Sequence, residues 1–140
     1  GVGAMAVVVR DDGTLLMIQR SDNGAWIFPS GFCDLGENVA YTAVRETREE
    51  TGLDIDIVRM LGVYSSPDFH HTYDNGHQIK NVGVAFLARP RSGPVQPNPS
   101  EVADWAWLLP AAGAARITPW LAPYYERMQT SLAGGPLVVA

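Results

Sequence analysis

The sequence predicts an α/β fold in a single domain, residues 1–140. Short apolar runs typical of β-strands recur through the first 110 residues, an amphipathic helical segment interrupts them, and a second one lies near the end of the chain. The length of 140 residues suits one domain, and no internal repeat or linker divides it. A chain of this size buries about two-thirds of its unfolded surface, enough for one core.

The chain begins with a predicted β-hairpin. The apolar runs Met5–Arg10 and Leu15–Gln19 flank Asp11–Gly13, which reads as a glycine-containing turn. A further short strand is expected at Trp26–Phe28, and Pro29 ends it because proline has no N–H to give to a strand ladder. A loop then leads to the first helix.

The first helix is predicted at Val39–Thr51. Asn38 is suited to cap its N-terminus, and Gly52 to end it in a left-handed conformation. The positions that recur at spacings of three and four, and so face the core, are Ala40, Ala43, Val44, Thr47 and Thr51.

The same helix carries an acidic stripe. Glu49 and Glu50 fall about 60° and 40° to either side of Glu46, so three carboxylates share one side, beside Arg45. Like charges at this spacing repel each other and destabilise a helix. The cluster becomes favourable when a hard divalent cation neutralises it, and oxygen ligands suit Mg²⁺ or Mn²⁺.

Strands and polar loops alternate in the next part of the chain. Ile55–Tyr64 is apolar and rich in β-branched residues, and Gln78–Ala88 alternates between apolar and polar residues, so both are expected strands. The segment 65–75 between them is polar, and Asp74–Gly76 is a strong turn signal.

The last third combines a loop, a strand and a helix. Four prolines make Arg89–Ser100 a loop, and Val102–Leu108 is a short strand. A final helix is expected from Thr118, its N-cap, to about Leu132. For the apolar end, residues 135–140, three interpretations stay open: a contact in a homodimer, a disordered tail, or a strand of the monomer.

Composition narrows the class of protein. The net charge of −5 argues against a nucleic-acid polymer as partner, because such partners call for a basic patch. A single cysteine, Cys33, allows no internal disulfide and suits the reducing cytoplasm. No apolar run reaches membrane-spanning length and no signal peptide is evident, so we expect a cytoplasmic protein without a membrane partner.

Residues 31–53 resemble the signature of the Nudix hydrolases. That signature consists of a glycine, five free residues, a glutamate, seven free residues and then Arg-Glu-U-x-Glu-Glu-x-Gly-U, where U is a bulky apolar residue. The matching residues are Gly31, Glu37, Arg45, Glu46, Glu49, Glu50, Gly52 and Leu53. Thr47 departs from the pattern at the first U, and Ser30 stands where a glycine is usual. The resemblance implies a Nudix-type α/β/α sandwich, a mixed β-sheet between helices.

The resemblance also implies a chemistry. The family hydrolyses a nucleoside diphosphate linked to another moiety, using Mg²⁺ or Mn²⁺ held by Glu46, Glu49, Glu50 and the backbone carbonyl of Gly31. Glu49 is either a ligand or the base. Arg45 is expected to orient a glutamate of the signature. Glu37, near the positive end of the helix, either caps it or supports the metal site.

In some members of this family the general base is not a glutamate of the signature but an acidic residue on a distant loop. Glu101 follows the proline-rich loop, and we take it as the leading such candidate, ahead of Asp68 and Asp104.

We expect the polar segment 65–75 to determine which substrate is bound. Phe69 and Tyr73 either stack on a base or anchor this loop. The adjacent His70 and His71 lack further ligands at zinc spacing, so we expect no zinc site there. The tryptophans expected in the core are Trp26, Trp105 and Trp107.

Three functions stay open. The favoured one is hydrolysis of an ADP-ribose-like compound or a sugar nucleotide. The alternatives are removal of pyrophosphate from a (d)NTP by a nucleotide-pool sanitising enzyme, and a non-catalytic nucleotide sensor on the same fold. In each case the partner is a small nucleotide.

Overall fold

The computed structural model describes residues 1–140 and contains two β-sheets, a separate hairpin and three helices. A five-stranded mixed sheet has the order β10-β5-β8-β1-β4, a three-stranded antiparallel sheet has the order β3-β2-β9, and β6 pairs with β7. The strands are β1 (Val2–Val8), β2 (Leu15–Arg20), β3 (Trp26–Ile27), β4 (Ser30–Phe32), β5 (Ile55–Tyr64), β6 (His70–Thr72), β7 (Gln78–Lys80), β8 (Val82–Pro90), β9 (Val102–Leu108) and β10 (Val138–Val139). The helices are α1 (Val39–Thr51), α2 (Pro110–Arg116) and α3 (Ala122–Leu132). The predicted α/β class is confirmed.

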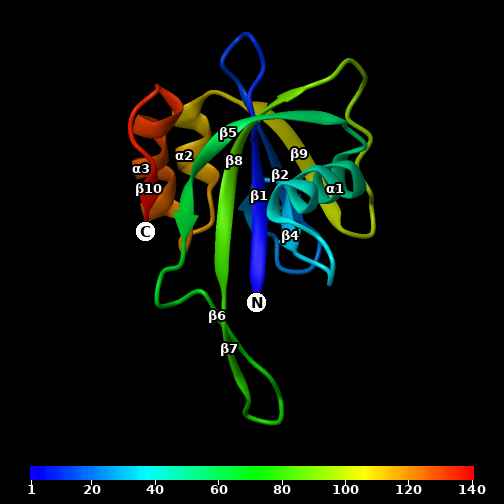
Figure 1. Ribbon diagram of the computed structural model, residues 1–140. Coiled ribbons are helices and arrows are strands. Elements are labelled where there is room, and N and C mark those ends of the chain that lie inside the picture. Colours follow the sequence, from blue (N-terminus) through cyan, green and yellow to red (C-terminus); the bar gives the residue numbers. More distant parts are fainter.

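Helices cover opposite sides of the five-stranded sheet (Figure 1). Alternate residues of β1 divide between two core clusters, as the period of two in a strand requires. Met5 and Val7 pack in the cluster that includes α3, whereas Ala4, Ala6 and Val8 pack in the cluster that includes α1. The α/β/α layering implied by the resemblance is therefore present.

The predicted hairpin between the first two strands is wrong. A turn forms at Arg10–Thr14, and Val9 bridges Leu15, but β1 then enters the large sheet and β2 the small one. Both strands are apolar on both faces, so each is stable in the interior with neighbours on both edges. These neighbours come from distant parts of the chain: β1 pairs with β8 and β4, and β2 with β9 and β3.

Helix α1 has the predicted bounds and caps. The Asn38 side chain accepts a hydrogen bond from the N–H of Tyr41, and Gly52 adopts φ 73° and donates to the carbonyl of Arg48. The hydroxyl of buried Thr47 donates to the Ala43 carbonyl at 2.7 Å. A hydroxyl therefore replaces the usual apolar side chain without being left unsatisfied.

The strands at 55–64 and 102–108 also have the predicted bounds. The predicted loop Arg89–Ser100 is wrong at its start, because Arg89 and Pro90 still pair with β5 as the end of β8, and 91–101 is the loop. The single strand expected at 78–88 is instead two strands, broken at Asn81, and β7 pairs with β6 across the predicted turn. The hairpin β6–β7 projects from the body of the molecule (Figure 1). Strand β4 and helix α2 were not predicted.

The final helix starts later than predicted. Thr118 does not cap it; the segment from Thr118 to Leu121 is a hydrogen-bonded turn, and α3 begins at Ala122, followed by Pro123 in its first turn. The C-terminal stretch forms the strand β10, parallel to β5, so the strand interpretation is confirmed over the disordered one.

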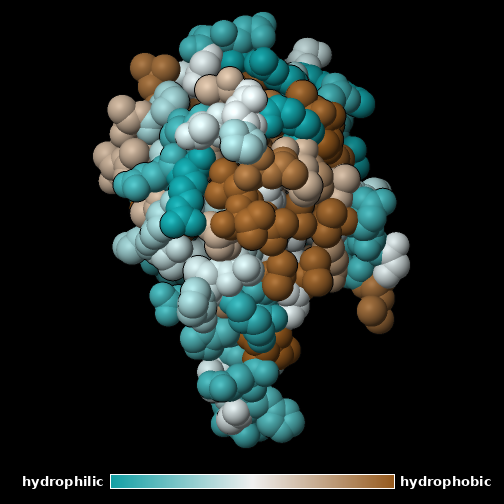
Figure 2. Space-filling model, turned by 60° about the vertical axis from the view of Figure 1, so that its left-hand side comes forward, coloured by the Kyte–Doolittle hydropathy of each residue, from teal (hydrophilic) through white to brown (hydrophobic).

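Apolar side chains gather on the face that carries β5 and β10 (Figure 2). The exposed apolar residues of these strands and of the residue before β10 are Val58, Met60, Leu137 and Val139. The homodimer contact predicted for the C-terminal stretch stays a prediction. None of the three helices is both long and apolar enough to cross a lipid bilayer.

Candidate active site

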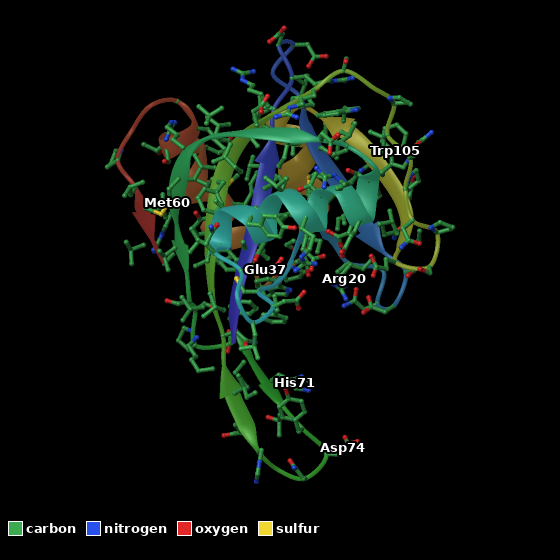
Figure 3. All side chains as sticks on the ribbon, turned by 45° about the vertical axis from the view of Figure 1, so that its right-hand side comes forward. Arg20, Glu37, Met60, His71, Asp74 and Trp105 are labelled. Atoms are coloured by element: carbon green, nitrogen blue, oxygen red, sulfur yellow. The ribbon has the colours of Figure 1, made fainter.

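A polar cleft of about 300 Å³ lies where α1 faces β4 and the end of the proline-rich loop. Four carboxylates line it: Glu46 and Glu50 from α1, Glu101 from the end of the proline-rich loop, and Asp22. The lining residues are Arg20, Ser21, Asp22, Ser30, Gly31, Phe32, Glu46, Glu50, Ser100 and Glu101. Figure 3 shows Arg20 and Glu37 on the same side of α1, with His71 and Asp74 on the distant hairpin.

Glu50 is the most buried of these acids, with 5% of its surface exposed. Its Oε1 accepts a hydrogen bond from the backbone N–H of Ser30 at 2.9 Å. Burial raises the pKa of Glu50 to about 8, and the nearby carboxylates of Glu46 and Glu101 add to the rise. A cation in the cleft would relieve this unfavourable charge.

Glu46 lies directly against Gly31. A Cβ atom on Gly31 would stand 2.1 Å from Oε1 and 2.2 Å from Cδ of Glu46. Glycine therefore allows the Glu46 carboxyl group to approach this closely, and no positive φ angle is involved. Burial also raises the pKa of Glu46, although the positive charge of Arg45 opposes the shift.

Arg45 holds the acids of the signature together. Its guanidinium makes a two-bond pair with Glu37, at 2.6 Å and 2.8 Å, and its Nη1 donates to Glu46 at 3.0 Å and to Glu49 at 3.2 Å. The hydrogen bonds that Arg45 donates to Glu37 lower the pKa of Glu37 to about 2, and the same bonds raise the pKa of Arg45. Glu37 also accepts from the N–H of Asp34, so it ties the loop before α1 to the helix.

The other predicted acids lie in different places. Glu49 is half exposed and does not line the cleft, although its pair with Arg45 links it to Glu46. Glu101 does line the cleft. Asp68 lines a separate pocket near the hairpin, and Asp104 accepts from the N–H of Trp105.

The register of β4 decides which backbone groups face the acids. Gly31 of β4 lies opposite Ala4 of β1. On one side of this pair the N–H of Cys33 donates to the carbonyl of Val2, and on the other side the N–H of Ala6 donates to the carbonyl of Pro29. Because hydrogen-bonded pairs alternate in an antiparallel ladder, the carbonyl of Gly31 points towards β1. The N–H and carbonyl of Ser30 point the opposite way, as its bond to Glu50 shows.

The donor set suits a hard cation, although no three acidic or imidazole side chains converge to metal-ligand spacing. Glu46, Glu50 and Glu101 offer oxygen ligands, the type that Mg²⁺ and Mn²⁺ prefer. Arg45 offsets part of the charge of Glu46, but neither Glu50 nor Glu101 has a salt bridge, and Arg20, the one cationic side chain that lines the cleft, makes a two-bond pair with Asp22.

The predicted substrate residues lie beside a second pocket. The Phe69 ring is nearly parallel to Phe32 on one side (6.5 Å between centroids, 14°) and to Trp120 on the other (5.2 Å, 9°). Tyr73 packs edge-on against His71. The expectation for Trp26, Trp105 and Trp107 is confirmed, because all three pack against the core clusters.

Sequence reasoning missed Arg20, Phe32 and Trp120. Arg20 ends an expected strand, and Phe32 occupies a free position of the signature, so neither carried a local signal. Trp120 lay within the predicted final helix, which gave no signal that it would face a pocket.

Comparison with known proteins supports this description. The family model described as the NUDIX domain matches residues 1–128. A MutT-like protein of Streptomyces ambofaciens is 37% identical over 116 residues, which make up 83% of this chain and 68% of that protein. An ADP-ribose pyrophosphatase of Methanocaldococcus jannaschii is 44% identical over 80 residues, 55% of this chain and 46% of the relative. Among solved structures, an ADP-ribose pyrophosphatase of Streptococcus suis superposes with a TM-score of 0.73 at 23% identity, covering 95% of this chain and 90% of that one, which shows the fold alone.

Proposed function

This chain belongs to the NUDIX domain family and is a hydrolase of phosphorus-containing anhydrides, and from this premise we propose that it cleaves the diphosphate linkage of a nucleoside diphosphate derivative. The observation that carries the proposal is the cleft shared by Glu46, Glu50 and Glu101 beside the signature helix. ADP-ribose-like compounds and sugar nucleotides are the favoured substrates. The name of the relative from Methanocaldococcus jannaschii supports the first of these.

We assign the cation, Mg²⁺ or Mn²⁺, to Glu46 and Glu50, with Glu49 as a further ligand or as the base. For the backbone ligand, the strand register favours the carbonyl of Ser30 over the predicted carbonyl of Gly31, because only the Ser30 backbone points towards α1. A bound cation would neutralise charge on the diphosphate and lower the pKa of a water molecule.

The remaining residues position the reactants. Arg45 is a positioning residue, since its bonds to Glu37, Glu46 and Glu49 fix the carboxylates relative to each other. Glu101 is the favoured general base, because it lines the cleft while Glu49 lies outside it. Arg20 lines the same cleft and can stabilise negative charge on the phosphoryl oxygens.

A product screen tests the proposal. The protein is incubated with ADP-ribose, sugar nucleotides, dinucleoside polyphosphates, and normal and 8-oxo (d)NTPs, with Mg²⁺, with Mn²⁺ and with EDTA. We expect metal-dependent turnover that yields a nucleoside monophosphate and a sugar phosphate, and that Glu50→Gln abolishes.

Two other outcomes are decisive. Release of pyrophosphate from a triphosphate as the best reaction would identify the sanitising alternative. Nucleotide binding without turnover of any compound would identify the sensor.

A further inference from the structure

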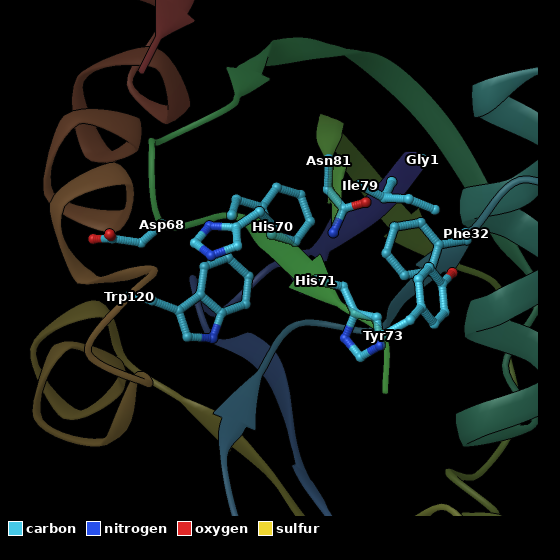
Figure 4. Close-up of a pocket in the computed structure, with 10 residues that line it drawn as sticks. Gly1, Phe32, Asp68, His70, His71, Tyr73, Ile79, Asn81 and Trp120 are labelled. Atoms are coloured by element: carbon cyan, nitrogen blue, oxygen red, sulfur yellow. The ribbon is translucent and has the colours of Figure 1, made fainter. Parts of the chain in front are cut away.

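A larger pocket, of about 580 Å³, lies at the base of the hairpin β6–β7 (Figure 4). Phe32 lines both this pocket and the acidic cleft, so a ligand that holds its diphosphate in the cleft has the pocket as its neighbour. The remaining lining residues are Gly1, Asp68, Phe69, His70, His71, Tyr73, Ile79, Asn81 and Trp120.

Asn81 is the unusual member of this set. Only 6% of its surface is exposed, and its side-chain amide has no hydrogen-bond partner within the protein, because the amide atoms are open to the pocket. The residue stands at the break between β7 and β8, where its backbone N–H donates to the carbonyl of Phe69 at 2.9 Å. Figure 4 shows the amide turned into the pocket. Since no protein group uses this amide, both its donor and its acceptor are available to a ligand in the pocket.

The walls of the pocket favour a flat ring. Phe32, Phe69 and Trp120 contribute nearly parallel rings to its lining, and Tyr73 stands on the hairpin. Aromatic rings hold planar ligands by stacking and edge contacts. The Asn81 amide adds an acceptor oxygen next to a donor nitrogen, which complements the edge of a nitrogen heterocycle.

We propose that this pocket is the nucleobase subsite and that Asn81 selects the base by bonding to its edge. The inference rests on the proposed function, because it takes the occupant to be part of a nucleotide.

The pocket between this one and the acids is less suited to a base. Its polar lining includes Arg20, which pairs with Asp22, and Asn23, whose side-chain oxygen already accepts from the N–H of Ala25. Its volume of about 290 Å³ is also half that of the outer pocket.

Calorimetric binding of four probes tests the proposal without turnover. AMP, GMP and UMP carry a base, whereas ribose 5-phosphate has the same sugar and phosphate without one. The probes are titrated into the wild type and into Asn81→Ala, Asn81→Asp and Trp120→Ala. Gln78→Ala is the matched control, because this exposed amide lies on the same hairpin and outside the pocket. Thermal melts identify any variant that fails to fold; Trp120 is 42% exposed, so its variant should fold even if the variants at Asn81 do not.

We expect the wild type to bind at least one nucleoside monophosphate roughly tenfold more tightly than ribose 5-phosphate. Asn81→Ala and Trp120→Ala should remove most of that difference, Asn81→Asp should reduce it because the donor is lost, and Gln78→Ala should keep it. Equal binding of all four probes by the wild type, or a difference that survives in Asn81→Ala, would overturn the proposal. If base-dependent binding is found but no nucleotide is hydrolysed, the hydrolase proposal fails and the subsite stands.

Discussion

Replacing Gly31 with alanine tests how the signature positions its first glutamate. The added Cβ atom would lie 2.2 Å from Cδ of Glu46. Non-bonded carbon atoms need about 3.5 Å, so the carboxyl group must move by roughly 1.3 Å. A displacement of about 1 Å within a catalytic site lowers the rate roughly 10²-fold. We expect a loss of that size in kcat/KM, measured with saturating Mn²⁺.

The fold should survive this change. The atoms in the way belong to the far end of a flexible side chain, and Gly31 has no positive φ angle. The free energy of unfolding should therefore change by no more than about 1 kcal/mol, measured by urea denaturation. The double variant Gly31→Ala/Glu46→Gln supplies the control. If Gly31 acts through Glu46, the double variant is no less active than Glu46→Gln alone.

Three results would refute this reasoning. Near-normal activity of Gly31→Ala would show that the position of Glu46 does not limit the rate. A large loss of stability would place the effect in the backbone. Losses that multiply in the double variant would show that the two residues act independently.

Three further predictions follow from the same structure. Because the pKa of Glu50 is raised to about 8, Mn²⁺ binding should displace a proton at neutral pH, and the affinity for Mn²⁺ should rise with pH until about 8. Calorimetry in buffers of different ionisation enthalpy measures the released proton and the affinity. An affinity for Mn²⁺ that does not change with pH would contradict the prediction. The pKa of Glu37 falls from 4.5 in the unfolded chain to about 2 in the folded protein, so its pair with Arg45 stabilises the fold fully above about pH 4.5 and loses that effect as the pH falls towards 2. In chemical denaturation, Glu37→Gln should therefore be less stable than the wild type near pH 6. The difference in the free energy of unfolding between the two should disappear in acid. A Cβ on Gly62 would lie 2.0 Å from the backbone oxygen of Val138, so Gly62→Ala should displace β10 and expose it to limited proteolysis, while unchanged cleavage would argue against this packing.

The local part of the structure could be predicted from sequence. The bounds of α1 follow from a cap at Asn38, a stop at Gly52 and a helical period between them, all within one segment. The acids share one side because their spacing fixes their angles. The strands at 55–64 and 102–108 likewise follow from their own composition.

The pairing of strands could not be predicted in this way. β1 and β2 lie close in sequence and join through a short turn, which suggested a hairpin, but their partners are β8 and β9. When a strand is apolar on both faces, its own sequence does not indicate which strands will pair with it. The hydrogen bonds that decide this come from segments many residues away.

The candidate site likewise has a part that could be predicted from sequence and a part that could not. The sequence by itself determined the helix, its caps and the spacing of Glu46, Glu49 and Glu50, because these depend on contacts within a few turns of one chain segment. Only the tertiary structure decided that Glu101 joins two of these acids in one cleft, that Ser30 and not Gly31 points its backbone at them, and that Asn81 faces a pocket without a partner. These arrangements depend on how distant segments pack, and periodicity within a segment does not encode that packing.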